Sequence, residues 1–105
     1  CSFGSFKDSI MSINHCICNY IPDLLLYCDC ADIVALTAPK PLVIVNGKDD
    51  PIFPIKSAVE SFALVSSVYK HLGAADKCRH VIGKGDHRFY AADAWPVMEQ
   101  FLNGK

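Results

Sequence analysis

The segment Leu42–Pro54, with the sequence LVIVNGKDDPIFP, determines how the rest of the chain is interpreted. It begins with a short apolar run rich in β-branched residues, and such a run without polar alternation predicts a strand buried on both faces. An Asn-Gly pair then supplies a turn, the adjacent carboxylates Asp49 and Asp50 follow, and two prolines stiffen the loop. Ligands and catalytic groups collect at the carboxyl ends of strands in open α/β sheets, which makes this loop a candidate site. An aspartate in such a loop is also a common turn former or helix cap.

Length and composition indicate one globular domain. The chain has 105 residues, of which 51% are hydrophobic and 20% charged, so it is neither disordered nor of low complexity. Its net charge of −1, with basic and acidic residues interspersed, argues against nucleic-acid binding. No apolar run is long enough to span a membrane, and the first residues do not resemble a signal peptide. Because the sequence begins at Cys1 rather than Met, we expect a processed chain or a fragment.

The cysteines leave three alternatives open. They are Cys1, Cys16, Cys18, Cys28, Cys30 and Cys78. The two C-x-C pairs, together with His15, invite a zinc interpretation, although structural zinc sites typically use longer spacings. Disulfides are the second alternative. Because cysteine also behaves as a small buried hydrophobe, we favour reduced packing thiols, no metal and no cofactor, in a reducing compartment such as the cytoplasm.

Caps and hydrophobic periodicity predict the remaining elements. These are a short helix from about Lys7 after a Ser5-x-x-Asp8 capping box, a helical turn over Leu24–Leu26 capped by Asp23, a short helix capped by Asp32 and ending near Leu36, a helix over Ile55–Leu72, a strand over Cys78–Ile82 and a helix from about Ala92 to Leu102. Gly73 is the expected C-cap of the longest helix, and Pro96 is expected in the first turn of the last one. The expected buried residues of that last helix are Ala94, Trp95, Met98 and Leu102. The order strand, helix, strand, helix predicts an α/β fold of parallel strands with crossover helices.

Two polar side chains follow the two predicted strands. Asp50 and His87 are 37 positions apart (87 minus 50), yet a right-handed crossover brings both loops to the same edge of the sheet. A carboxylate that accepts the Nδ1–H of an imidazole leaves the other ring nitrogen free to take a proton from a nucleophile. Gly83 and Gly85 are expected to let the backbone bend at His87. The other histidines, His15, His71 and His80, are expected to be packed or capping residues.

These motifs resemble a known family. Gly47-x-x-Asp50-x-x-x-Pro54 after one strand, and Gly85-Asp86-His87-Arg88-Phe89 after the next, resemble the acid and histidine loops in the C-terminal part of an α/β-hydrolase. More narrowly, HCICNYIPDLL, APKPLVIVNGKDDPIFP and HRFYAADAWP are similar to the acetyl xylan esterase branch, near the dienelactone-hydrolase-like enzymes.

The resemblance implies a carboxylic-ester hydrolase with a Ser-His-Asp catalytic triad. Asp50 would be the triad acid and His87 the general base, acting on a small ester such as an acetylated carbohydrate. Phe53, Phe89 and Tyr90 are the candidates for lining the substrate pocket. Prolyl peptidases and lipases share this layout, so peptide and lipid substrates stay open.

One feature of the family is missing from the sequence. No G-x-S-x-G occurs in the 105 residues, so we expect the serine and the oxyanion hole to come from an absent N-terminal portion or from another chain. The alternative is a non-catalytic α/β interaction module, which would associate with itself or a partner through apolar surface that an absent sheet would have covered.

Overall fold

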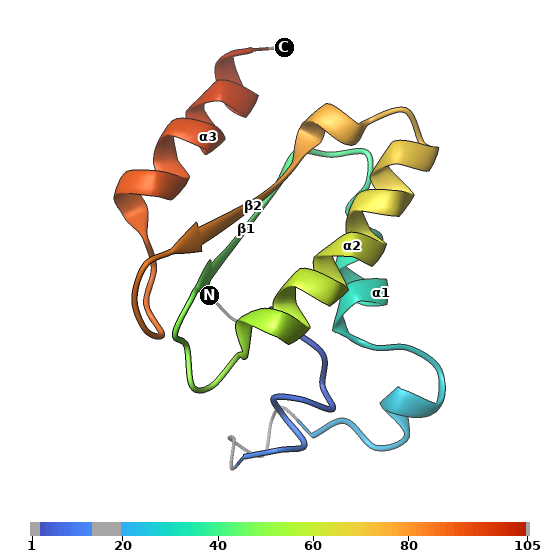
Figure 1. The fold of residues 1–105 in the computed structure, drawn as a ribbon. Coiled ribbons are helices and arrows are strands. Elements are labelled where there is room, and N and C mark those ends of the chain that lie inside the picture. Colours follow the sequence, from blue (N-terminus) through green and yellow to red (C-terminus); the bar gives the residue numbers. More distant parts are fainter. Residues whose placement is uncertain (1–2, 14–19, 105) are drawn as a thin grey trace.

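The computed structural model describes residues 3–13 and 20–104 as a small α/β domain around two parallel strands (Figure 1). In chain order its elements are the 3-10 turn η2 (Leu24–Leu26), α1 (Cys30–Ala35), β1 (Leu42–Gly47), α2 (Ile55–His71), the 3-10 turn η3 (Ala75–Lys77), β2 (Cys78–Gly83) and α3 (Ala91–Asn103). The predicted order of strand, helix, strand and helix is confirmed from Leu42 onward.

The sheet brings the two post-strand loops together. β1 and β2 pair in parallel from Leu42↔Cys78 to Gly47↔Gly83, and α2 is the crossover that connects them. In Figure 1, α1 and α2 lie on one side of the strands and α3 lies on the other. The carboxyl ends of both strands therefore lie at the same edge, as parallel pairing requires.

β1 is buried on both faces, as its apolar run predicts. Ile44 belongs to a cluster that includes Val65 and Tyr69 of α2, whereas the next residue, Val45, packs with Tyr90 and Ala94. Successive side chains of a strand point to opposite faces, so each face of β1 contributes to a separate cluster. The two clusters fix the strand between its covering helices and hold its carboxyl end in place.

α2 ends in the motif that its sequence predicts. Gly73 adopts φ 71°, the left-handed conformation that favours glycine. The N–H of Ala74 donates to the carbonyl of Tyr69 at 2.8 Å, and the N–H of Gly73 donates to that of Lys70 at 3.1 Å. These are the two bonds of a Schellman motif, and they satisfy carbonyls that the helix end would otherwise leave unpaired.

The N-cap of α1 is Asp29, and the prediction of Asp32 as the cap is wrong. The Asp29 carboxylate accepts from the N–H of Cys30 at 2.6 Å, and Asp32 accepts from the N–H of Asp29 at 2.8 Å, so the two aspartates form a capping box. Asp29 also accepts from the N–H of Phe6 at 2.7 Å. The spacing of two aspartates three positions apart is that of a capping box, in which the first residue is the N-cap and the second is N3.

We expect Asp29→Ala to lower the free energy of unfolding by about 2 kcal/mol, at the upper end of the range for an N-cap. The substitution removes both the cap of α1 and the contact that holds Phe6. Urea unfolding followed by circular dichroism measures the change. Asp23→Asn is the matched control, because asparagine tolerates the left-handed conformation of this residue and the Asp23 side chain makes no cap hydrogen bond to η2. Equal losses for the two variants would contradict the assignment.

Two predicted features near the N-terminus are wrong. Residues 6–12 form turns rather than a helix from Lys7, although the Ser5 hydroxyl still accepts from the N–H of Asp8 at 3.1 Å. η2 is present as predicted, but Asp23 precedes it in a left-handed conformation and does not cap it through its side chain. Both segments lack the long apolar stripe that stabilises a helix in a folded protein, so a capping signal alone is insufficient there.

α3 is less buried than its pattern predicts. Ala94 is buried and Met98 is half-buried, but Trp95 is 54% exposed and Leu102 is 70% exposed. The helix begins at Ala91, so Pro96 lies in its second turn and not in the first. A sheet of two strands offers α3 only a narrow surface, and the outer part of its apolar stripe therefore stays uncovered.

The described cysteines are free thiols. Burial raises the pKa of both Cys30 and Cys78, which keeps these thiols protonated, and Cys28 is also unpaired with another cysteine. The zinc alternative also needs His15, Cys16 and Cys18, which lie outside the described residues, as does Cys1. Within residues 3–13 and 20–104, no three His, Cys, Asp or Glu side chains converge on a metal position. Among the helices of this part of the chain, none combines the length and apolarity that crossing a membrane demands.

Candidate active site

The loop after β1 holds the carboxylate of Asp50 in a fixed orientation. Its Oδ1 accepts from the backbone N–H of Ile52 at 2.7 Å and from that of Phe53 at 3.0 Å. Such short-range bonds are typical of an aspartate that organises its own turn. The side chain of Asp50 is 0% exposed, so the loop delivers a buried carboxylate with one oxygen still available.

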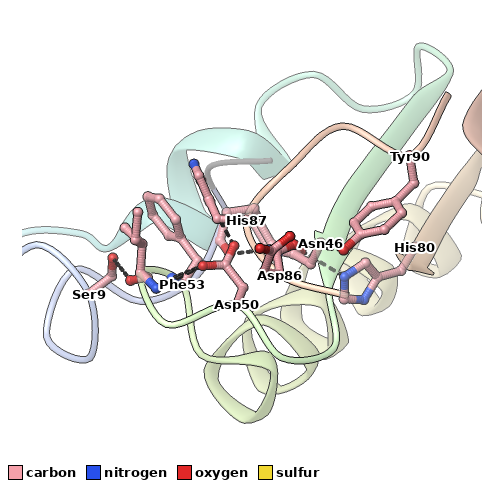
Figure 2. A network of polar contacts seen from close by, with 10 residues as sticks. Ser9, Asn46, Asp50, Phe53, His80, Asp86, His87 and Tyr90 are labelled. Carbon is pink, nitrogen blue, oxygen red and sulfur yellow. Dashed lines mark hydrogen bonds and ion pairs between the residues drawn. The ribbon is translucent and has the colours of Figure 1, made fainter. Parts of the chain in front are cut away.

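The remaining oxygen of Asp50 contacts His87. Figure 2 shows Asp50 Oδ2 and His87 Nδ1 facing each other, and the distance between them is 2.7 Å. An ionised carboxylate only accepts hydrogen bonds, so Nδ1 must carry the proton and donate. No described residue hydrogen-bonds the other ring nitrogen, Nε2, and the side chain of His87 is 36% exposed. The imidazole thus has one nitrogen fixed by Asp50 and one that can exchange a proton with a bound molecule.

The surroundings of Asp50 keep it ionised. Burial alone would raise its pKa, but the bonds from the N–H of Phe53, from His87 and from the N–H of Ile52 outweigh burial and hold the pKa below its ordinary value of 3.8. The carboxylate is therefore negative at neutral pH. A negative charge against Nδ1 stabilises the imidazolium that forms when Nε2 accepts a proton.

We expect this carboxylate to make part of the stability acid-sensitive. Its pKa is depressed in the folded state, so its contribution is complete above the unfolded value near 3.8 and is lost as pH falls through the lower, folded value. Urea unfolding at pH 7 and at pH 3 measures this loss in the wild type and in Asp50→Asn. The variant should lose less stability on acidification, and Asp86→Asn, at an exposed carboxylate, is the control. Identical losses in wild type and Asp50→Asn would contradict the expectation.

Backbone bonds join the acid loop to the histidine loop. The N–H of Lys48 donates to the carbonyl of Gly83 at 2.8 Å, and the N–H of Asp49 donates to that of Gly85 at 2.9 Å. A Cβ at Gly47 would lie 2.1 Å from the carbonyl oxygen of Asp86, so only glycine allows the two loops to approach this closely. The side chains of Asp50 and His87 contact each other because the backbones of their loops are held close together.

Gly85 lies in the bend that follows β2, as expected, whereas Gly83 is the last residue of the strand and is needed for a different reason. Among the described glycines, only Gly73 has a positive φ. A Cβ at Gly83 would lie 2.2 Å from the ring of Tyr90, so Gly83 provides space for that ring. The Tyr90 hydroxyl then donates to the carbonyl of Asp86 at 2.6 Å, which ties down the residue before His87.

The three predicted pocket residues lie in different places. Phe53 stacks on His87, with ring centroids 5.8 Å apart and an angle of 22° between the planes. Phe89 is half-exposed and packs edge-on against Trp95, beside a small apolar cavity between β1 and α3. Tyr90 is buried in the cluster of Val45 and Ala94. Of the three, only Phe53 contacts the His87 ring.

His80 is a packed residue, as its place within a predicted strand suggests. Its ring lies against Phe3 and Phe62, and Nε2 donates to Asn46 Oδ1 at 2.8 Å. The Asn46 amide in turn donates to the carbonyl of Phe3 at 2.9 Å. Burial lowers the pKa of His80, which keeps the ring neutral. Asn46, predicted as part of a turn, is the fully buried centre of this network within β1 (Figure 2).

The serines of the described segments bond to groups other than His87. Ser9 is 1% exposed, and its hydroxyl donates to the carbonyl of Ile52 at 2.6 Å. Ser57 accepts from the N–H of Ser5 at 2.8 Å. No hydroxyl in residues 3–13 or 20–104 hydrogen-bonds the imidazole. Sequence reasoning gave Ser9 no role, since its partner lies 43 positions away and no local signal marks the pair.

Comparisons with known proteins identified no relative of this chain. A scan against protein-family models found no match, and neither the curated proteins nor the solved structures include one that matches this chain. The interpretation of the Asp50–His87 pair therefore depends on its own geometry and on the motifs in the sequence.

Proposed function

We propose that this chain supplies the acid and the histidine of a Ser-His-Asp carboxylic-ester hydrolase, as the C-terminal portion of an α/β-hydrolase fold. The observation that carries the proposal is the 2.7 Å contact between His87 Nδ1 and the buried Asp50 carboxylate. The two residues follow successive parallel strands in the order acid and then histidine, which is the order that the fold uses.

In this proposal His87 moves one proton in each half of the reaction. Nε2 takes the proton from a serine hydroxyl as its oxygen attacks the ester carbonyl carbon, and then gives it to the departing alcohol. In the second half Nε2 takes a proton from water, which attacks the acyl-serine, and returns it to the serine as the carboxylic acid leaves. Asp50 stays ionised throughout, holds the Nδ1–H tautomer and stabilises the imidazolium.

The serine of this proposal comes from outside these residues. The sequence contains no G-x-S-x-G, and no described hydroxyl bonds His87. An N-terminal portion of a longer protein, or another chain, would supply both the serine and the oxyanion hole. A small ester is the proposed substrate, with an acetylated carbohydrate as the first candidate because of the sequence resemblance, and Phe53 would border the acyl group beside His87.

A fluorophosphonate probe, read by intact mass, tests the proposal. We expect no stoichiometric labelling of the 105 residues alone, and labelling of one serine in a form that includes the nucleophile. His87→Ala should abolish that labelling, whereas His71→Ala, at an exposed histidine near the end of α2, should not. Labelling of the 105-residue chain by itself would contradict the missing serine. Labelling that survives His87→Ala would contradict the role of the histidine.

A non-catalytic interaction module is the second candidate function. A cavity of about 390 Å³ near η2 is lined almost entirely by apolar side chains. Leu26, which lines it, is 76% exposed, and the following residue, Tyr27, is 86% exposed. Contiguous exposed apolar surface promotes association. Sedimentation at rising protein concentration tests this candidate, which predicts a dimer weakened by Leu26→Ser. A monomer at all concentrations would count against self-association.

A further inference from the structure

A buried serine from the N-terminal segment contacts the loop that carries Asp50. Ser9 belongs to residues 3–13, is 1% exposed, and donates its hydroxyl proton to the carbonyl oxygen of Ile52 at 2.6 Å. Figure 2 shows Ser9 reaching this loop from a segment that is distant in sequence from both β1 and β2. The short distance and the burial indicate a bond that water does not readily replace.

The peptide group that Ser9 contacts also contacts Asp50. The carbonyl of Ile52 and the N–H of Phe53 belong to the same peptide unit, and that N–H donates to Asp50 Oδ1 at 3.0 Å. The hydrogen bonds therefore run without a break from Ser9 through this peptide to Asp50, and from Asp50 Oδ2 to His87 Nδ1. Phe53, whose N–H is part of the chain of bonds, also stacks its ring on the imidazole.

Bonds in such a chain strengthen one another. A hydroxyl proton on the carbonyl oxygen draws electron density from the peptide and makes its N–H a better donor, an effect of about 10–30% per bond. The bond from Ser9 also stops the peptide from rotating, so the N–H of Phe53 keeps pointing at Asp50 and the ring keeps its place on His87. The effect of Ser9 thus reaches the pair through the Ile52–Phe53 peptide.

We propose that Ser9 is a positioning residue, which holds the Ile52–Phe53 peptide in the orientation that Asp50 and His87 require. The inference rests on the proposed function only in treating the Asp50–His87 pair as catalytic. The positioning itself is a property of the folded chain, and it can be measured without substrate.

Nuclear magnetic resonance of Ser9→Ala tests the proposal. Loss of the hydroxyl weakens the bond from Phe53, and we expect the pKa of the Asp50 carboxyl to rise by roughly half a unit, about a threefold change in its ionisation constant. The amide proton of Phe53 should move upfield, as it does when a donor loses strength. Ser12→Ala is the matched control, because the Ser12 hydroxyl also donates to a backbone carbonyl at 2.6 Å, that of Lys7, but on an exposed turn with no link to Asp50.

Two outcomes overturn the proposal. In the first, Ser9→Ala lowers the unfolding midpoint but leaves the Asp50 pKa and the Phe53 amide unchanged, which would make Ser9 a structural tie only. In the second, Ser12→Ala moves both signals equally. If Ser9→Ala does not fold, Ser9→Cys keeps the shape with a weaker donor and should give smaller shifts in the same direction, and no shift would again overturn the proposal. Absence of ester hydrolysis in every longer form would defeat the proposed function and leave these shifts unaffected.

Discussion

Asp50→Asn is expected to reduce kcat for ester hydrolysis by about 10⁴-fold in a form of the protein that contains the serine. The buried carboxylate accepts the Nδ1–H of His87 at 2.7 Å, and its Oδ1 is occupied by two backbone N–H groups. An asparagine amide would keep its oxygen toward those two donors and turn its NH₂ group toward Nδ1. His87 would then hold its proton on Nε2, the nitrogen that accepts one from the serine in the proposed mechanism.

Hydrolysis of p-nitrophenyl acetate across a range of pH measures this effect. Asp49→Asn is the control, because Asp49 is the exposed neighbouring carboxylate and only its backbone N–H contacts the histidine loop. His87→Ala should cause a loss at least as large as that of Asp50→Asn, since it removes the base itself whereas Asp50→Asn only misorients it. Activity that survives either substitution would remove the pair from the mechanism.

Gly47→Ala is expected to lower the free energy of unfolding by about 3 kcal/mol and to separate Asp50 from His87. The new Cβ would lie 2.1 Å from the carbonyl oxygen of Asp86 and 2.7 Å from that of Gly85. Both are backbone atoms, which cannot move aside as the end of a flexible side chain can. The histidine loop must therefore shift away from β1, and the bond from the N–H of Asp49 to Gly85 weakens with it.

Gly73→Ala separates this close approach from the general effect of losing a glycine. Gly73 has φ 71°, and no atom lies within 4 Å of the place that a Cβ would take there, so alanine meets conformational strain only, about 1 kcal/mol. Urea unfolding gives the two stabilities, and the downfield Nδ1 proton of His87 shows whether the contact with Asp50 persists. The signal of the His87 Nδ1 proton should disappear in Gly47→Ala and remain in Gly73→Ala. Equal destabilisation with the signal retained in both would contradict the role of Gly47.

Local sequence predicts the elements that have strong patterns. The apolar run at Leu42 is short but unbroken and β-branched, the stripe along Ile55–His71 is long and regular, and Gly73 marks its end, so β1 and α2 follow from the sequence. The exposure of Trp95 and Leu102 does not follow from the sequence, because the burial of α3 depends on how much sheet lies beneath it. Asp29 rather than Asp32 is the N-cap of α1 because the two aspartates form a capping box, a local spacing that the expected cap at Asp32 overlooked.

The approach of the acid loop to the histidine loop is predictable from topology. Two loops that follow adjacent parallel strands must share an edge of the sheet. Within the first loop, the turn that the Asp50 carboxylate makes with Ile52 and Phe53 is what places Asp50, rather than Asp49, against His87. The positions of Phe89 and Tyr90 are not predictable in this way, because neighbouring aromatic residues on a loop can turn to either side. The contact of Ser9 with Ile52 is the least predictable, since nothing near Ser9 in the sequence reveals its partner.

The register of the sheet also has a consequence for folding kinetics. Every pair from Leu42↔Cys78 to Gly47↔Gly83 joins residues 36 positions apart (78 minus 42), so none of these contacts can form until α2 has closed the crossover. Contacts of such long sequence separation are slow to form, because the entropy of closing the loop is lost before any pairing compensates for it. We therefore expect the signal of the Asp50–His87 bond to appear late in refolding, after helical circular dichroism has recovered.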